Sequence, residues 1–329
     1  MINDKKHYRF ALISDIHIDR ENKGKNTYFI YAEENLSRAL GIIKDLGCDF
    51  IISAGDQVTN ASGAGEEWRV YRDIIKRSGC EDRIYAALGN HETRSAKYGI
   101  NTLEECISDF IRYAELDKKD IIRPDGKPYY IMTEPVFGDV FIFMANEKGA
   151  DINELDNFSD EQMDWTEDTL RKYTAEGRNI YLIQHANYYR YGAGDDITEP
   201  AYEGAVRTID EKGNTFKNNL RFKRLTEKYR DIIWVSGHTH IDLEDDVNYS
   251  DNGGKCCHML HIPALAGTTR LSRDSKGKRT LDRTFHKGSS QGFIVDAYED
   301  KIVFSGIDLY SGELYPQYTY TIYRKRDKR

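Results

Sequence analysis

The chain has 329 residues, of which 39% are hydrophobic and 31% are charged, a composition typical of a globular protein with a well-solvated surface. Its formal net charge of −8 argues against broad, sequence-independent binding of nucleic acid, because proteins that grip the phosphate backbone are usually basic. Its five cysteines include no CxxC pair, which argues against a disulfide framework and against a zinc site built from thiolates.

The sequence contains no stretch of 18 or more consecutive apolar residues, so we predict that no helix spans a membrane. Residues 1–14 lack the apolar segment of a secretory signal peptide, and the expectation is a cytoplasmic protein. The cysteines are then interpreted as reduced thiols in the core. No sequence pattern indicates the oligomeric state.

Apolar runs alternate with amphipathic stretches through the first part of the chain. Three short apolar runs are predicted strands: residues 8–14 (YRFALIS), 50–54 (FIISA) and 84–88 (IYAAL). Residues 33–46 carry leucine and isoleucine at helical spacing, and residues 66–79 are predicted to form a helix that ends at Gly79. This order predicts parallel strands joined by crossover helices.

The alternation continues and then gives way to a β-rich segment. Further predicted strands cover residues 140–145 (VFIFMA), 179–184 (NIYLIQ) and 231–236 (DIIWVS). Predicted helices cover residues 160–176, with Ser159 as the capping residue, and about 216–230. The last apolar runs, GFIVDAY, KIVFSGIDL and LYPQYTYTIY, are separated by short turns. They predict antiparallel strands at the C-terminal end.

Five of the predicted strands are followed by side chains that can bind metal ions. These are Asp15 and His17, then Asp56, then Asn90 and His91, then His185, and finally His238 and His240. Ligands in α/β proteins lie at the carboxyl edge of the sheet, so these groups are expected to converge there. Nitrogen and oxygen ligands without a thiolate suit manganese, iron, zinc or cobalt better than magnesium or calcium. The pattern predicts a centre for two metal ions.

The spacing within the blocks supports a shared centre. Residues two apart on a strand lie on one face, so Asp15 and His17 are expected to hold one ion, while His238 and His240 serve two neighbouring ions. The glycines at 55, 89 and 237 are expected to remove Cβ bulk beside the site. A single histidine is more often a satisfied polar residue than a ligand, so the argument depends on the whole set.

Three further features leave two interpretations open. His258 and His261 either lie near the pocket or are ordinary strand residues. The tyrosines of residues 186–194 (ANYYRYGAG) either line a substrate pocket or pack in the interior. The basic segment 270–290 could attract an anionic substrate, although a solvated loop is the favoured interpretation.

The ordered blocks DIH, GD, GNHE, QH and GHTH, spread over residues 15–240, resemble those of the calcineurin-like metallophosphoesterases. The resemblance implies an α/β fold, a layered sandwich of two mixed β-sheets flanked by helices. On this basis we expect a catalytic domain over residues 1–270. Residues 271–329 would then add a basic loop and an antiparallel β extension packed on the same domain.

The resemblance also implies a role for each residue of the blocks. It assigns Asp15, His17 and His240 to the first metal, Asn90, His185 and His238 to the second, and Asp56 to both. His91 would bind no metal; it would face the scissile phosphorus and stabilise charge or protonate the leaving oxygen. The simplest role for Glu92 is to orient a ligand histidine.

The expected function is a hydrolase that acts on phosphate mono- or diesters of a small phosphorylated substrate. The nucleophile would be a hydroxide that bridges two divalent ions, such as manganese, iron or zinc. The alternative is a metal-binding scaffold of the same fold with little activity. Two branches of the family fit less well. Gln57 stands within the block that reads GDYVDRG in protein Ser/Thr phosphatases, and Thr59 stands where purple acid phosphatases carry a tyrosine.

Overall fold

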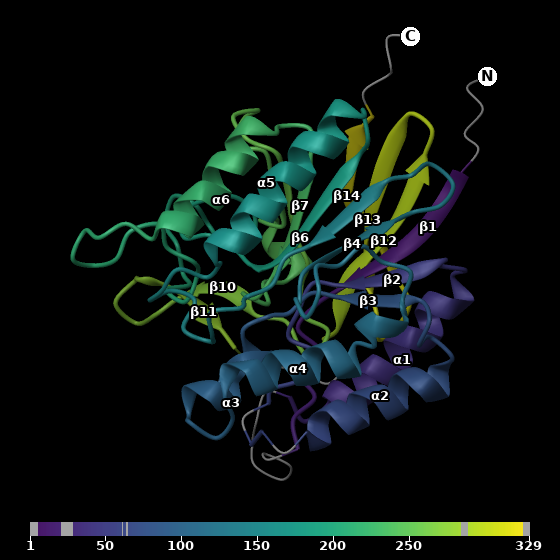
Figure 1. Ribbon diagram of the computed structural model, residues 1–329, viewed down its shortest axis with the longest axis horizontal. Helices are drawn as coiled ribbons and strands as arrows, with labels where there is room; N and C mark the ends of the chain where they lie inside the picture. The colour runs from purple at the N-terminus through teal and green to yellow at the C-terminus, as the bar shows by residue number, and fades with distance from the viewer. Residues whose placement is uncertain (1–5, 21–28, 61, 64, 284–288, 325–329) are drawn as a thin grey trace.

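Two six-stranded mixed β-sheets form the centre of the computed structural model, which describes residues 6–20, 29–60, 62, 63, 65–283 and 289–324. Helices cover the outer faces of both sheets (Figure 1). The first sheet has the order β14 (Leu314–Tyr323), β13 (Lys301–Asp308), β12 (Gln291–Tyr298), β1 (Lys6–Ile13), β2 (Phe50–Ser53) and β3 (Ile84–Ala86). The predicted layered α/β fold is confirmed.

The first sheet joins the N-terminal strands to the C-terminal ones. β1 pairs in parallel with β2, and β2 with β3, through the crossover helices α1 (Ala32–Asp45) and α2 (Glu66–Ser78), as predicted. On its other side, β1 pairs antiparallel with β12, and β13 and β14 continue this pattern outward. The antiparallel C-terminal segment is therefore confirmed, and it completes the sheet that carries β1. The division of the chain at residue 270 stays a prediction.

The second sheet has the order β4 (Tyr130–Thr133), β5 (Val140–Phe143), β6 (Ile180–Ala186), β7 (Ile233–Gly237), β9 (His258–His261) and β8 (Tyr249–Ser250). Helices α5 (Asp160–Ala175) and α6 (Lys217–Lys228) lie beside β6 and β7, away from α1 and α2 (Figure 1). The Ser159 side chain accepts a hydrogen bond from the Gln162 N–H, which confirms the predicted cap of α5.

Aromatic side chains pack the two sheets against each other. Phe10 on β1 stacks on Phe50 of β2, with ring centroids 5.0 Å apart. Across the interface, Phe141 on β5 stacks on Tyr181 of β6 at 4.3 Å. The ring of Phe10 meets both of these edge-on, at 5.4 and 5.6 Å. Offset and edge-on aromatic pairs of this kind fix the relative position of their strands. These contacts therefore fix how the strand ends of one sheet lie relative to the strand ends of the other.

Several shorter elements were not predicted. The main ones are η1 (His91–Thr93), α3 (Arg94–Lys97), α4 (Leu103–Tyr113) and the hairpin of β10 (Arg270–Arg273) and β11 (Arg279–Asp282). The interpretation of this basic segment as a loop is wrong for the hairpin, in which Leu271 lies opposite Leu281. Its alternating apolar residues are too few to reveal strands in the sequence. Residues 284–288 lie outside the described residues.

Two simpler predictions concern the cysteines and membrane helices. All five cysteines are buried and free, as expected for reduced core thiols. Among the described residues, no helix is both long enough and apolar enough to cross a membrane. The cytoplasmic location stays a prediction.

Candidate metal centre

The candidate ligands lie where the carboxyl ends of the two sheets meet. The first sheet contributes side chains that follow β1, β2 and β3, and the second sheet contributes side chains on β6 and after β7. In this order they are Asp15 and His17, Asp56, Asn90 and His91, His185, and His238 and His240. The centre is thus assembled between two sheets and not along the edge of one.

The backbone at five of these residues is left-handed. The φ angles are 54° at Asp15, 51° at His17, 55° at Asp56, 84° at His238 and 62° at His240. Residues other than glycine rarely adopt this conformation. The argument from strand faces is therefore wrong, because β1 already ends at Ile13 and β7 at Gly237. These side chains instead lie on tight turns beyond the strands, a kind of backbone strain that is concentrated at functional sites.

The turn that follows β1 is held by backbone hydrogen bonds to the turn that follows β2. The Asp15 N–H donates to the Gly55 carbonyl at 3.1 Å, and the His17 N–H donates to the Asp56 carbonyl at 3.0 Å. The Cβ of a larger residue at Gly89 or Gly237 would collide with the carboxylates of Asp56 and Asp15, respectively. The predicted need for small residues beside the site is thereby confirmed.

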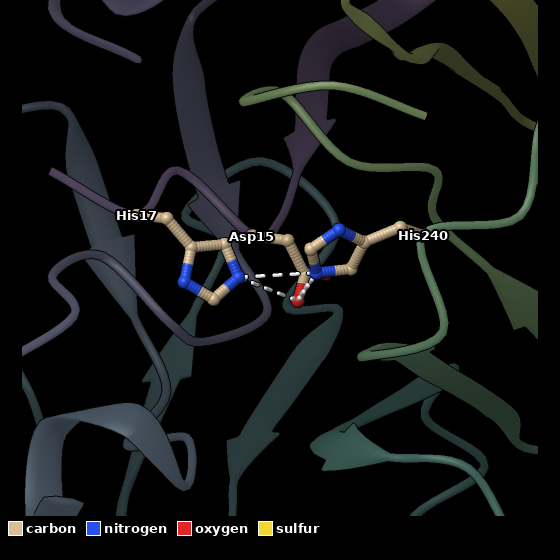
Figure 2. A group of neighbouring side chains, drawn as sticks. All are labelled: Asp15, His17 and His240. Carbon is tan, nitrogen blue, oxygen red and sulfur yellow. Dashed lines mark hydrogen bonds and ion pairs between the residues drawn. The ribbon is translucent and has the colours of Figure 1, made fainter. Parts of the chain in front are cut away.

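Asp15, His17 and His240 form one compact group of possible ligands (Figure 2). The Nε2 atoms of His17 and His240 lie 3.0 Å apart, and Asp15 Oδ1 lies 3.1 Å from His240 Nε2 and 3.6 Å from His17 Nε2. Three ligand atoms thus face one another across a space in which a cation would replace the direct contacts. The other oxygen of this carboxylate, Asp15 Oδ2, accepts a hydrogen bond from the His238 N–H at 2.9 Å, which holds the side chain in place.

Asp56, His185 and His238 form a second such group. Asp56 Oδ2 lies 3.0 Å from His185 Nε2 and 3.8 Å from His17 Nε2, so the same oxygen faces both groups. His185 Nδ1 lies 3.1 Å from the Ala54 carbonyl, which only accepts, so this nitrogen carries the proton and Nε2 is free to bind a metal. Asp56 therefore lies between the two groups, and its role as a bridging ligand stays a prediction.

The donor set fits transition-metal ions. The Oδ1 atom of Asn90 is buried and has no hydrogen-bond partner among the described residues, although a buried amide oxygen normally has one. His238 Nε2 lies 3.3 Å from the Gly204 carbonyl, which leaves Nδ1 as its free ligand atom. Carboxylate, amide and imidazole groups with no thiolate suit manganese, iron or zinc. The roles of individual ligands stay predictions.

Mutual electrostatics shift the pKa values of the buried groups. Burial alone would raise the pKa of Asp15, but nearby His240 and His185 hold it well below its usual range. Burial would lower the pKa of His185, but the negative charges of Asp56 and Asp15 raise it to about 9. Burial and the neighbouring His185 lower the pKa of His238 to about 4. The site therefore pairs ionised carboxylates with imidazoles and holds negative charge in the interior, which favours bound cations.

His91 forms a third cluster of possible ligand atoms with His17 and Asp56, but Arg94 contacts its ring. Its backbone N–H donates to Asp56 Oδ1 at 2.9 Å, and its Nε2 lies 4.0 Å from Asp56 Oδ2. Its Nδ1 lies 3.3 Å from Nη1 of Arg94, which can only donate, so Nδ1 accepts and the ring proton is placed on Nε2. Burial lowers the pKa of His91 well below its usual range. The ring is thus a neutral donor that faces the centre.

Glu92 holds the turn that carries Asp56. Its carboxylate accepts hydrogen bonds from the N–H groups of Gln57 at 2.5 Å and Gly89 at 2.8 Å, and from those of Asp56 and Val58 at 3.2 and 3.3 Å. Burial and the negative charge of Asp56 raise the pKa of Glu92 to about 8. Cations next to Asp56 would favour the ionised form that these four donors require. Glu92 therefore positions Asp56 and not the predicted histidine.

A cavity of about 380 Å³ opens onto the centre. His17, Asp56, Asn90, His91, His238 and His240 line it on the metal side. The remaining lining includes Phe29, Arg94, Lys97, Tyr98, Tyr202 and Arg283, of which only Arg283 belongs to a segment, 270–290, that was considered as a possible attractor of an anionic substrate. These residues lie on short or irregular segments, and the sequence contains no signal that they face a common space.

The open interpretations are resolved in part. The tyrosines Tyr188 and Tyr191 are buried in the hydrophobic cluster between the second sheet and its helices, so they pack and do not line the cavity. His258 bonds to the Tyr249 hydroxyl, away from the centre. His261 lies directly behind the GHTH block, since its Nε2 is 2.8 Å from the Thr239 hydroxyl. His261 therefore supports the turn that carries His238 and His240.

Comparisons with known proteins agree with this geometry. Residues 8–242 match the model of the family described as calcineurin-like phosphoesterase. A dimetal phosphatase from Danio rerio superposes with a TM-score of 0.63 at 12% sequence identity, over 98% of this chain and 100% of that one. A purple acid phosphatase from yellow lupin (Lupinus luteus) superposes with a TM-score of 0.60 at 14% identity, over 98% of this chain and 55% of that one. Among curated protein sequences, none matches significantly.

Proposed function

The chain belongs to the calcineurin-like phosphoesterase family, and we propose that it hydrolyses phosphate mono- or diesters of a small substrate at the centre described above. The observation that carries the proposal is the position of Asp56, whose Oδ2 lies 3.0 Å from His185 Nε2 and 3.8 Å from His17 Nε2 and so faces both groups of possible ligands beside one cavity. Two cations clamped about one bridging carboxylate are suited to in-line displacement at phosphorus.

The proposed cofactors are two divalent transition-metal ions, either manganese, iron or zinc. Bound there, they would lower the pKa of a coordinated water so that hydroxide is available at neutral pH, and they would polarise the phosphoryl oxygens. The proposed ligands are Asp15, His17 and His240 for the first ion, Asn90, His185 and His238 for the second, and Asp56 for both. Two ions (+4) and two aspartates (−2) leave a charge of +2, which attracts a phosphate group.

His91 is the proposed general acid. Arg94 holds its Nδ1, so the Nε2–H points to the cavity side and can donate to an oxygen of the substrate. In the transition state this proton would stabilise or protonate the leaving oxygen, which develops negative charge as its bond to phosphorus breaks. Tyr202 lies beside His238, and burial raises the pKa of its hydroxyl to about 12. Its hydroxyl therefore stays protonated and available as a hydrogen-bond donor.

The test measures metal content and turnover on the same preparation. The protein is stripped of metal, reloaded with manganese, iron or zinc, and assayed with p-nitrophenyl phosphate and bis(p-nitrophenyl) phosphate. We expect about two ions per chain and turnover of at least one ester, with no turnover after chelation. The scaffold alternative predicts bound metal and no turnover of either ester or of a panel of natural phosphoesters. That result would overturn the proposal.

A further inference from the structure

The cavity beside the metal centre contains more positive charge than the reacting phosphoryl group needs. Arg94 and Lys97 reach it from α3, and Arg283 reaches it from the segment that follows β11. Helix α3 and the hairpin of β10 and β11 lie on the same side of the molecule (Figure 1). The cavity volume of about 380 Å³ is in the range of pockets for small molecules.

Acidic side chains do not balance these cations. Among the described residues, Asp56 is the only acidic one in the lining, and its carboxylate faces the histidines of the centre. Lys97 forms an ion pair with Asp151. Arg94 and Arg283, in contrast, form no ion pair with any of the described residues. Two divalent ions in the centre would more than neutralise the two buried aspartates, and the charge of both arginines would still be available to a ligand.

The chemistry and the position of the two arginines indicate which part of a substrate they contact. A guanidinium group presents a planar set of N–H donors that matches a carboxylate or a phosphate. Arg94 uses one nitrogen to hold His91, which leaves its other donors for the cavity. Because His91 is the proposed donor to the leaving oxygen, an anion beside Arg94 would belong to the leaving group. Arg283 lines the same cavity as Tyr202 and His91, so it lies on the same open side of the centre.

We infer that the substrate is a small phosphoester whose leaving group carries a second oxyanion, a phosphate or a carboxylate, and that Arg94 and Arg283 bind it. The inference rests on the proposed function, because it describes the substrate of the same centre. It makes the two arginines residues that determine specificity, while the chemical step belongs to the metal centre and His91.

The test compares three esters with the same three-carbon chain. Propane-1,3-diol bisphosphate carries a second phosphate, 3-phosphooxypropanoate carries a carboxylate, and propane-1,3-diol monophosphate carries a neutral hydroxyl. We expect kcat/KM to be roughly 10- to 100-fold higher for at least one of the doubly anionic esters than for the monophosphate, since hydrogen bonds to charged groups are among the stronger ones. The better of the two identifies the second anion as phosphate or carboxylate.

Variants assign the preference to the arginines. Arg283→Gln and Arg94→Gln should each reduce the ratio of kcat/KM between the preferred doubly anionic ester and the monophosphate by roughly tenfold, and Arg283→Lys should restore much of it. The matched control is Arg273→Gln, on the same hairpin, whose guanidinium pairs with Glu199 outside the cavity lining. This control should keep the ratio of the unmodified protein.

A binding measurement separates recognition from turnover. Calorimetric titration with propane-1,3-bisphosphonate and with propylphosphonate, neither of which can be hydrolysed at its P–C bond, should give tighter binding of the bisphosphonate, and Arg283→Gln should reduce the difference. Hydrolysis of all three esters at equal kcat/KM would overturn the inference and leave the proposed function standing. Absence of hydrolysis of any phosphoester by the metal-loaded protein would instead overturn the proposed function.

Discussion

The Asp56 carboxylate lies 3.0 Å from the His185 imidazole, although the two residues belong to different sheets. Asp56 follows β2 in the first sheet, whereas His185 is on β6 in the second. Their contact exists only when the two sheets are packed against each other, as the rings of Phe10 and Tyr181 pack them. The formation of the centre is therefore tied to the formation of the core between the sheets.

This position of Asp56 predicts the effect of removing its charge. Asp56→Asn keeps the shape of the side chain but removes the negative charge that faces His17, His185 and His91 within 4.0 Å. We expect both ions to bind roughly 100-fold more weakly or worse, because even residues that only contact a ligand change metal affinity 10- to 100-fold. Metal per chain, measured by elemental analysis after dialysis, should fall from about two toward zero.

Asp120→Asn is the control for this experiment. Asp120 is exposed and lies on a turn between helices and strands that do not contribute to the centre, so this variant should retain both ions. If Asp56→Asn also retained two ions at full affinity, Asp56 would not be a bridging ligand, and the proposed centre would need a different arrangement.

The role of His91 can be tested through the leaving group. His91→Ala should retain both metal ions but lower kcat by roughly 10²- to 10⁴-fold for alkyl phosphates, whose leaving oxygen needs a proton. The loss should be much smaller for p-nitrophenyl phosphate, because its phenolate leaves without protonation. His258→Ala, which removes a histidine that bonds to Tyr249 outside the cavity lining, should leave both rates unchanged. An equal loss for the two classes of ester would argue against protonation of the leaving oxygen.

The sequence was sufficient to predict which side chains meet at the candidate centre but not the backbone that carries them. Short blocks such as GNHE and GHTH identify side chains by type and order, and each follows an apolar run that is easily recognised as a strand. The left-handed turns at Asp15 and His240 depend on hydrogen bonds between separate turns and loops, which periodicity along one chain does not encode. The same reason explains why Arg94 was missed and why Arg283 was noted only as part of a basic segment, since the two face one cavity from segments far apart in sequence.

The raised pKa of His185 predicts how metal affinity depends on pH. In the metal-free protein the pKa of His185 is raised to about 9, so at neutral pH a proton must leave before its Nε2 can bind an ion. The affinity of the second ion should therefore increase as pH rises toward 9, by roughly tenfold per pH unit where one proton is released. Competition with a metal-binding dye between pH 6.5 and 9 measures this slope. A flat profile would show that His185 binds no ion.

The stability of the metal-free protein should change in the opposite direction. A histidine whose folded-state pKa lies above its unfolded value of 6.5 stabilises the fold fully below pH 6.5, and this contribution is lost as pH rises to about 9. Glu92 changes the stability in the same direction. Because its pKa is raised from 4.5 to about 8 in the folded protein, the free energy of unfolding falls as pH rises from 4.5 to 8. The Tm of the chelated protein should therefore fall between pH 6.5 and 9. A rising Tm over this interval would contradict the charge arrangement of the centre.

Two glycine substitutions separate local strain from damage to the centre. Gly55 has φ = 127°, and the Cβ of an alanine would lie 2.6 Å from Nδ1 of His185. Gly55→Ala should displace this ring and weaken binding of the second ion more than that of the first, and it should also lower the free energy of unfolding by roughly 1–3 kcal/mol.

Gly41, on α1, has no atom within 4 Å of the added Cβ. Gly41→Ala should raise stability by up to about 1 kcal/mol, because alanine favours a helix more than glycine does. Chemical denaturation and metal titration of both variants measure these effects. Equal binding of the two ions in Gly55→Ala would show that His185 does not belong to the second site.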